Sequence, residues 1–294
     1  MRYEAYDATT GSGYATNVVY SSGTDTFTVQ NLPFVGNNVF SRDTVLSGLG
    51  ADSPYGVYES PATYTDSQTG KTINQFNYRA IYAVSPSGKT QFAIVRTGDF
   101  ADYGFGGFVY QRNGAVTLPT SGQALYTGKY AGLIDYNGRS GLNGTGSDIN
   151  YTSGDMTMAV DFNAFNTSQS GTAANAVTGS ITNRKIFDTK GKDITSTVLA
   201  NLSAQTSTTV SSLPVLTLKV GPGVMNANGE VAGQVASPMP GSAKSYESGT
   251  FYAVLADNPT YSAGEVVGII TVTSQVPQNT SVTARETGGF ILQR

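Results

Sequence analysis

The chain has 294 residues, only 13% of them charged, a formal net charge of −3, and no Cys, His or Trp. Without imidazole or thiol, the sequence excludes a Ser-His-Asp hydrolase, a thiolate nucleophile, an iron–sulfur cluster and histidine ligation of haem or zinc. The slight negative charge, with no basic stripe, disfavours a nucleic-acid partner. The length supports two domains, and 35 glycines with few charges favour an all-β fold.

The first predicted strands lie before residue 119. Side chains suited to half-buried strands recur in Tyr78–Val84, Gln91–Arg96 and Gly107–Arg112. The segment Asn113–Gln123 then interrupts this pattern with Pro119 and two glycines. We therefore expect an N-terminal antiparallel β domain over residues 1–118 and a second domain over 119–294.

The most unusual segment is Arg96–Tyr110, which combines five aromatic residues, four glycines and two aspartates. One interpretation is a loop whose rigid aromatic surface binds a ligand or a protein. The other, which we favour, is a glycine-kinked hairpin whose aromatic side chains fill the N-terminal core. The first interpretation gives a set of candidate ligand-binding residues: Asp99, Asp102, Tyr103, Phe105, Phe108 and Tyr110.

The second half continues with strands and one short helix. Met156, Met158, Val160 and Phe162 alternate with more polar residues and are expected on one buried face. Asp193, as N-cap, followed by apolar residues at helical spacing, predicts a helix across a barrel end or side. Further strands are predicted at Leu213–Val220, Thr250–Leu255, Glu265–Thr273 and Thr287–Leu292, with turns at Asn113-Gly114, Asn137-Gly138, Asn143-Gly144 and Asn228-Gly229.

Carboxylates provide the remaining candidates for chemistry. The pairs Asp99 with Asp102 and Asp155 with Asp161 have the residue type of a glycosidase site, but spacing in sequence does not give the separation across a cleft that this chemistry needs. The stretch that begins at Asp135 lacks the full ligand pattern of a calcium loop. We predict no catalytic residue, no metal site and no cofactor, and hence a protein that is not an enzyme.

An ordered set of small motifs marks the C-terminal half: residues 126–132 (YTGKYAG), 156–162 (MTMAVDF), 177–181 (VTGSI), 228–233 (NGEVAG), 249–253 (GTFYA), 265–269 (EVVGI) and 286–290 (ETGGF). This half resembles the C-terminal domain of the transferrin-binding-protein-like surface lipoproteins. The resemblance implies an eight-stranded antiparallel β-barrel preceded by a handle-like β domain. The chain departs from the family's haem-binding members, which are expected to use His.

From this resemblance we expect a non-enzymatic binding protein, displayed on the outer surface of a bacterial outer membrane or secreted. Its ligand would be a host iron protein, haem or another solute, bound at loops. The resemblance also implies an outer-membrane translocon as a partner during export, and a lipid anchor outside the given sequence. No window reaches the length of a membrane-spanning helix. The alternative is a structural surface subunit or adhesin that forms an extracellular layer or filament.

Overall fold

A computed structural model describes residues 1–36, 39–44, 49, 55–98, 103–137, 149–162, 177–219 and 224–294. Within these residues the protein is almost entirely β, as predicted. The strands are β1 (Arg2–Tyr3), β2 (Thr16–Ser21), β3 (Thr26–Gln30), β4 (Val39–Arg42), β5 (Gly56–Glu59), β6 (Thr63–Thr65), β7 (Thr72–Asn74), β8 (Tyr78–Val84), β9 (Thr90–Thr97), β10 (Gly106–Arg112), β11 (Gln123–Asn137), β12 (Asn150–Asp161), β13 (Val177–Phe187), β14 (Leu216–Lys219), β15 (Glu230–Pro238), β16 (Ser245–Ala256), β17 (Glu265–Val276) and β18 (Asn279–Gln293), and the helix is α1 (Thr195–Thr206).

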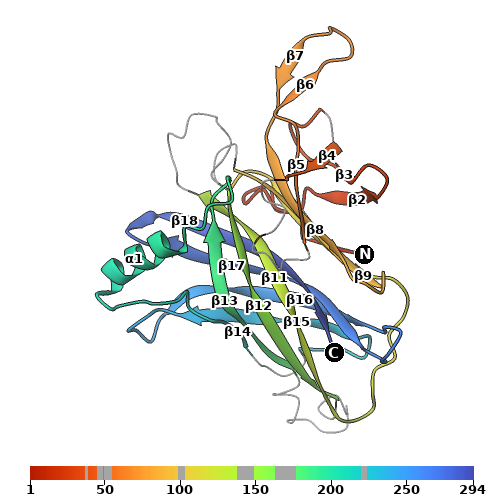
Figure 1. Ribbon diagram of the computed structural model, residues 1–294, viewed down its shortest axis with the longest axis vertical. Coiled ribbons are helices and arrows are strands. Elements are labelled where there is room, and N and C mark those ends of the chain that lie inside the picture. The colour runs from red at the N-terminus through yellow and green to blue at the C-terminus, as the bar shows by residue number, and fades with distance from the viewer. Residues whose placement is uncertain are drawn as a thin grey trace.

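The N-terminal part is an eight-stranded antiparallel sheet in the order β1-β10-β9-β8-β5-β4-β3-β2, so that β1 and β2 form its edges. The hairpin β6–β7 projects from it (Figure 1). One face of the sheet has its own core, in which Phe27 stacks on Phe40 with ring centroids 4.8 Å apart. The sheet ends at Arg112 and the next strand begins at Gln123. The division of the chain at residue 119 stays a prediction.

The C-terminal part is a closed antiparallel barrel of β11 to β18, in which β18 pairs with β11. Side chains alternate between the inside and the outside, and Met156, Met158 and Val160 of β12, with Phe162 directly after it, are all buried in the interior as predicted. Glycines make room for aromatic rings there: a Cβ at Gly288 would lie 2.1 Å from the Tyr130 ring, and one at Gly268 would lie 2.3 Å from Phe290. The barrel is therefore a filled scaffold.

One polar network lies inside the barrel, around Arg184. Its guanidinium donates to both oxygens of Glu247 at 2.7 Å and to Glu286 at 2.8 Å. The Tyr130 hydroxyl donates to Glu286 at 2.6 Å, and Ser237 donates to Glu247 at 2.6 Å. Burial raises the pKa of Glu286. Burial and the neighbouring Glu286 carboxylate together raise the pKa of Tyr130 well above its ordinary value. Nearly every buried oxygen of this network is thus hydrogen-bonded, as burial of charge requires.

The two ends of the barrel are covered by different segments. The helix α1 crosses one end, where Val198 and Leu199 pack against a small apolar cluster. It follows the predicted position, but Ile194 rather than Asp193 occupies the N-cap, and the Asp193 carboxylate accepts the Thr195 N–H at 2.9 Å. The segment between β10 and β11 covers the other end, where Val116 and Leu118 pack against the barrel core. No helix among the described residues is long and apolar enough to cross a membrane.

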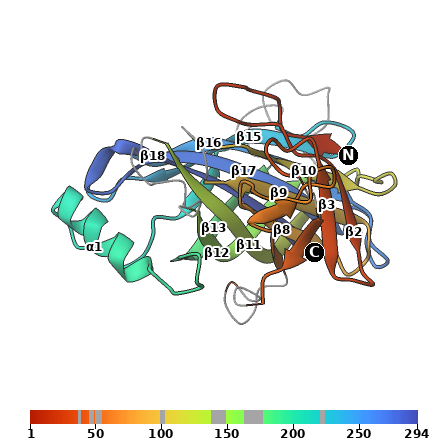
Figure 2. The ribbon, with the colours of Figure 1, turned by 90° about the horizontal axis from the view of Figure 1, so that it is seen from above.

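The N-terminal sheet lies against the outside of the barrel (Figure 2), and a continuous apolar core joins them. Phe92 of β9 packs over Gly289 of β18, where a Cβ would lie 2.3 Å from its ring. At the rim of this contact, buried Glu265 of β17 accepts hydrogen bonds at 2.8–2.9 Å from three hydroxyls, those of Ser85 and Ser87 in the β8–β9 turn and that of Thr90 at the start of β9. Apolar packing and hydrogen bonds together fix the sheet on the barrel.

Candidate functional site

The predicted ligand-binding residues are divided between two faces of the N-terminal sheet. Asp99 and Asp102 lie outside the described residues. Phe105 faces the sheet's own core, with its ring centroid 5.0 Å from that of Tyr14. Phe108 and Tyr110 lie on the opposite face of β10 and are buried against the barrel. Of these aromatic residues, only Phe105 packs in the N-terminal core, where the favoured interpretation put all the aromatic side chains; Phe108 and Tyr110 instead pack in the core shared with the barrel.

The glycines of this segment allow β10 to approach its neighbours closely. A Cβ at Gly106 would lie 2.1 Å from the carbonyl oxygen of Val95, and one at Gly107 would lie 2.8 Å from the nitrogen of Ala15. No side chain fits at these distances, so glycine is required here. The close approach brings residues 4–14 alongside β10, where Glu4 N–H donates to the carbonyl of Phe108 and Tyr14 N–H to that of Gly106.

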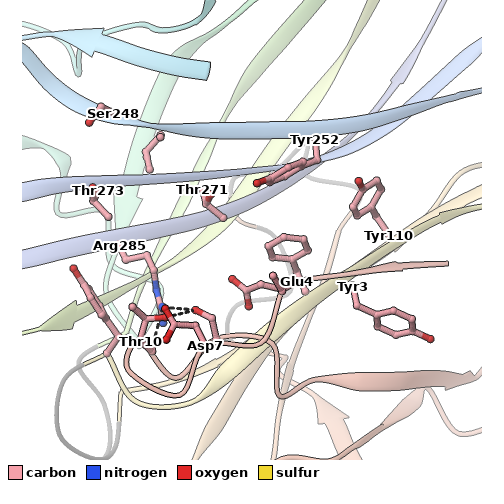
Figure 3. A pocket seen from close by; sticks show the side chains of 16 residues that line it. Tyr3, Glu4, Asp7, Thr10, Tyr110, Ser248, Tyr252, Thr271, Thr273 and Arg285 are labelled. Carbon is pink, nitrogen blue, oxygen red and sulfur yellow. Dashed lines mark hydrogen bonds between the residues drawn. The ribbon is translucent and has the colours of Figure 1, made fainter. Parts of the chain in front are cut away.

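Tyr103, Phe108 and Tyr110 line a cavity of about 590 Å³ between the N-terminal sheet and the barrel wall (Figure 3). We call it the junction cavity. Its volume lies within the roughly 300–1,000 Å³ of small-molecule sites. The other lining residues come from β1 and the segment after it, and from β16, β17 and β18: Tyr3, Glu4, Ala5, Asp7, Thr10, Ser12, Ser248, Gly249, Tyr252, Thr271, Val272, Thr273 and Arg285.

The barrel contributes a hydroxyl-rich wall. Ser248 and Tyr252 project outward from β16, and Thr271 and Thr273 project outward from β17, because their neighbours in each strand point into the barrel. The Tyr252 ring faces Phe108 of β10, with centroids 6.3 Å apart and planes tilted by 32°. Aromatic faces from both parts of the protein thus converge on one space.

Among the described residues that line the cavity, Arg285 is the one cation, and protein groups already pair with it. It donates to Asp135 at 2.6 Å and 3.0 Å, to the carbonyl of Thr10 at 2.9 Å and to the Ser12 hydroxyl at 2.9 Å. It also stacks on the ring of Tyr103, 4.5 Å from the centroid. Arg285 therefore attaches the segment of residues 4–14 to the barrel and positions one wall of the cavity.

Glu4 is held in the same way. Its carboxylate accepts two hydrogen bonds from the buried guanidinium of Arg96, at 2.7 Å and 2.9 Å, and one from the Gly13 N–H at 3.0 Å. Burial opposes its charged form, but Arg96 and Arg285 outweigh burial and hold the pKa of Glu4 below its ordinary value. Both partly buried charges at the cavity are thus neutralised within the protein.

Several hydroxyls of the cavity remain open to a ligand. Within the described residues, the hydroxyls of Tyr110, Tyr252, Ser248 and Thr273 have no hydrogen-bond partner, whereas that of Thr271 bonds to Thr250 at 3.1 Å. Burial raises the pKa of Tyr110 to about 12, so its hydroxyl keeps its proton at neutral pH. The cavity therefore offers groups that both donate and accept.

The carboxylate pairs do not form a glycosidase site where the structure describes them. Asp155 and Asp161 lie six residues apart on one strand, a separation of about 20 Å at roughly 3.3 Å per residue. Glycosidase carboxylates lie about 5–9.5 Å apart. Asp155 instead bonds to Lys129 at 2.8 Å. Asp135, considered for a calcium loop, is a buried residue of β11 bound to Arg285.

Sequence reasoning missed most of the cavity wall: Tyr3, Ser248, Tyr252, Thr271, Thr273 and Arg285. Their positions in the chain lie more than 90 residues from the aromatic segment, on either side. Arg285 and its neighbour Glu286, which are the two charged residues of β18, were the local sign of buried ion pairs. This sign does not say which residues surround them.

Comparison with known proteins finds similar structures but no similar sequences: no family model and no curated protein matches. A double mutant of transferrin binding protein B from Haemophilus parasuis matches with a TM-score of 0.40 at 12% identity, over 89% of this chain and 40% of that one. Intact transferrin binding protein B with N and C lobes matches with a TM-score of 0.32 at 12% identity, over 78% and 38%. A surface lipoprotein matches with a TM-score of 0.32 at 12% identity, over 93% and 96%.

Two of these structures are transferrin binding proteins and one is a surface lipoprotein, the class of protein whose motifs the C-terminal half resembles. The chain spans about 40% of the length of the transferrin binding protein B structures. The assignment of the fold rests on the strand pairing and barrel closure seen in this protein.

Proposed function

We propose that this chain is a non-enzymatic binding protein of the bacterial cell surface or the extracellular space, and that the junction cavity is its ligand site. The observation that carries the proposal is the cavity itself: a space of about 590 Å³ with aromatic walls from two separate sheets. Pockets of this size that are lined by aromatic side chains and a few polar groups are the usual form of a small-molecule site.

The architecture supports a binding role for the junction rather than for the barrel interior. Side chains and the Arg184 network fill the barrel, so it serves as a rigid scaffold. The junction has walls fixed by buried contacts on both sides, with Phe92 packed over Gly289 and Arg96 paired with Glu4. A rigid, preformed cavity loses little entropy when a ligand binds.

The finer parts of the proposal rest on the motif resemblance of the C-terminal half. They are a role in nutrient acquisition, attachment to the outer leaflet of the outer membrane through a lipid, and passage through a dedicated translocon. A protein ligand at the loops, such as a host iron protein, belongs to the same proposal. The absence of His fits a ligand other than His-ligated haem.

The test is ligand capture by the intact protein and by matched variants. Protein purified from its own host is examined by native mass spectrometry, and the unloaded protein is screened against a small-molecule library by thermal shift. Tyr252→Ala removes one wall of the cavity and should abolish binding. Tyr261→Ala, in an exposed tyrosine outside the lining, should leave it unchanged. Equal binding by Tyr252→Ala and the parent would place the ligand elsewhere and refute the assignment.

A structural subunit is the second candidate, because the N-terminal sheet has an unpaired edge. In the described residues β2 pairs only with β3, and Val19 on it is 55% exposed. Exposed edges are templates for pairing with another chain. Analytical ultracentrifugation decides between the candidates: concentration-dependent polymers without ligand favour the subunit, and a monomer favours the binding protein.

A further inference from the structure

The junction cavity has three properties that together define a class of ligand: neutralised charges, aromatic rings from both sheets and open hydroxyls. We propose that it binds an uncharged saccharide. This inference rests on the proposed function, in which the cavity is the ligand site, and adds the chemistry of what enters it.

The charges exclude an ionic ligand. Arg285 already makes four hydrogen bonds and a ring contact, and the Glu4 carboxylate is held by Arg96 and the Gly13 N–H. An anion would have to displace Asp135 from Arg285, and a cation would have to displace Arg96 from Glu4. Breaking either pair leaves a buried charge without a partner, which is strongly unfavourable.

The remaining carboxylate of the lining does not change this conclusion. Asp7 lies in a turn at the cavity edge, where its side chain accepts the Thr9 N–H at 2.8 Å. That hydrogen bond lowers the pKa of Asp7, and the residue is exposed to solvent. Water screens an exposed carboxylate, so it adds little attraction for a cation.

The aromatic rings of the lining fit a ligand ring whose faces carry C–H groups. Phe108 lies 6.3 Å from Tyr252 across the junction and 6.3 Å from Tyr110 on its own strand. The faces of a pyranose ring present C–H groups, which pack on the negative face of an aromatic ring, while its edge carries the hydroxyls. Tyrosine and phenylalanine supply such contact area at a low cost in rotamer entropy.

The open hydroxyls distinguish a saccharide from a purely apolar ligand. Four lining residues have hydroxyls with no hydrogen-bond partner among the described residues: Ser248, Thr273, Tyr252 and Tyr110. An apolar occupant would remove them from water without replacing their hydrogen bonds, which is unfavourable. Sugar hydroxyls both donate and accept, as these groups do, and can satisfy them.

The experiment uses the full chain and isothermal titration with neutral trisaccharides of α-glucan, β-glucan, β-xylan and β-N-acetylglucosamine. A sialylated trisaccharide and 2-naphthol serve as charged and apolar probes. We expect one neutral saccharide to bind with little dependence on salt. Tyr252→Ala should weaken it more than 10-fold, and Thr273→Val, which removes one hydroxyl at constant shape, by roughly 2- to 10-fold. Tyr261→Ala should change nothing.

The results separate this inference from the proposed function. Binding of 2-naphthol or of the sialylated probe alone, lost in Tyr252→Ala, would overturn the saccharide and keep the cavity as the ligand site. Saccharide binding unaffected by both cavity variants would place the sugar elsewhere and also overturn the inference. If no probe binds and the protein from its host carries nothing, both the inference and the proposed function are refuted.

Discussion

The contact between Phe92 and Gly289 allows a quantitative test of how the sheet is joined to the barrel. Phe92 is fully buried and packs edge-on to Tyr55, with centroids 5.3 Å apart. Phe92→Ala should therefore reduce the free energy of unfolding by about 3–5 kcal/mol, the usual range for loss of a buried ring. A Cβ at Gly289 would lie 2.3–2.6 Å from three ring atoms, so Gly289→Ala forces the ring to move and should cost about 1–3 kcal/mol.

The two changes should compensate each other when combined. With the Phe92 ring gone, the new methyl group at position 289 enters empty space, so Gly289→Ala in the Phe92→Ala background should be neutral or stabilising. The double-mutant cycle then gives a coupling energy of about 1–3 kcal/mol. Urea unfolding followed by circular dichroism and tyrosine fluorescence measures each corner, since the chain has no Trp.

Additive effects, within about 0.5 kcal/mol, would show that the ring does not lie over Gly289 and would refute this packing. Ile73→Ala on the projecting hairpin is the control and should change stability by no more than about 0.5 kcal/mol, because Ile73 is 45% exposed. The shape of the parent curve tests the predicted domains. One transition is expected if the shared core couples the two parts, and two transitions if residues 1–118 and 119–294 unfold independently.

Three further predictions concern ionised groups. Tyr130→Phe removes the 2.6 Å hydrogen bond to Glu286 and should lower the free energy of unfolding by about 1.5–3 kcal/mol in urea titrations; no change would mean that the bond is absent. Arg184→Met leaves two buried carboxylates without their cation and should lower the free energy of unfolding by about 3–5 kcal/mol. Part of this loss should be recovered at low pH, where Glu286, whose pKa burial raises, protonates; a neutral effect would contradict the network. Asp25, which accepts hydrogen bonds from Arg42, should titrate in NMR near its pKa of about 2. Its stabilising effect is therefore present above about pH 4 and lost as the pH falls through about 2. Arg42→Ala should return the midpoint of the Asp25 titration toward 3.8.

Alternation in the sequence predicted the positions of several strands. Tyr78–Val84 coincides with β8, and the predicted face of Met156, Met158, Val160 and Phe162 lies in the barrel core. The pattern underestimated the length of β17 and β18. Both strands continue through Thr, Ser and Asn residues, whose backbone pairing does not depend on apolar side chains. The pattern overestimated the length of β14, which was predicted to begin at Leu213. Leu213 instead packs under α1, and the strand begins at Leu216.

The candidate site was predictable only in part, for a reason of geometry. Tyr103, Phe108 and Tyr110 stood out because aromatic and glycine residues are concentrated around them, and all three line the cavity. Phe105 was in the same segment but lies before β10 and packs in the core on the other face of the sheet. Tyr252 and Thr273 carry no local sign of a site, because their role depends on which part of the barrel the sheet covers.

The same geometry explains why a cavity exists at this place. A twisted sheet on the curved wall of a barrel makes close contact along a band and diverges on either side of it. Here the band runs through β9 over β17 and β18, where Phe92 contacts Gly289. Beyond β10 the surfaces separate over β16, and Arg285 attaches the segment of residues 4–14 across the opening. The cavity is therefore a consequence of how the two sheets fit together, and its walls keep their spacing only while the band of contact and the Arg285 attachment are both intact.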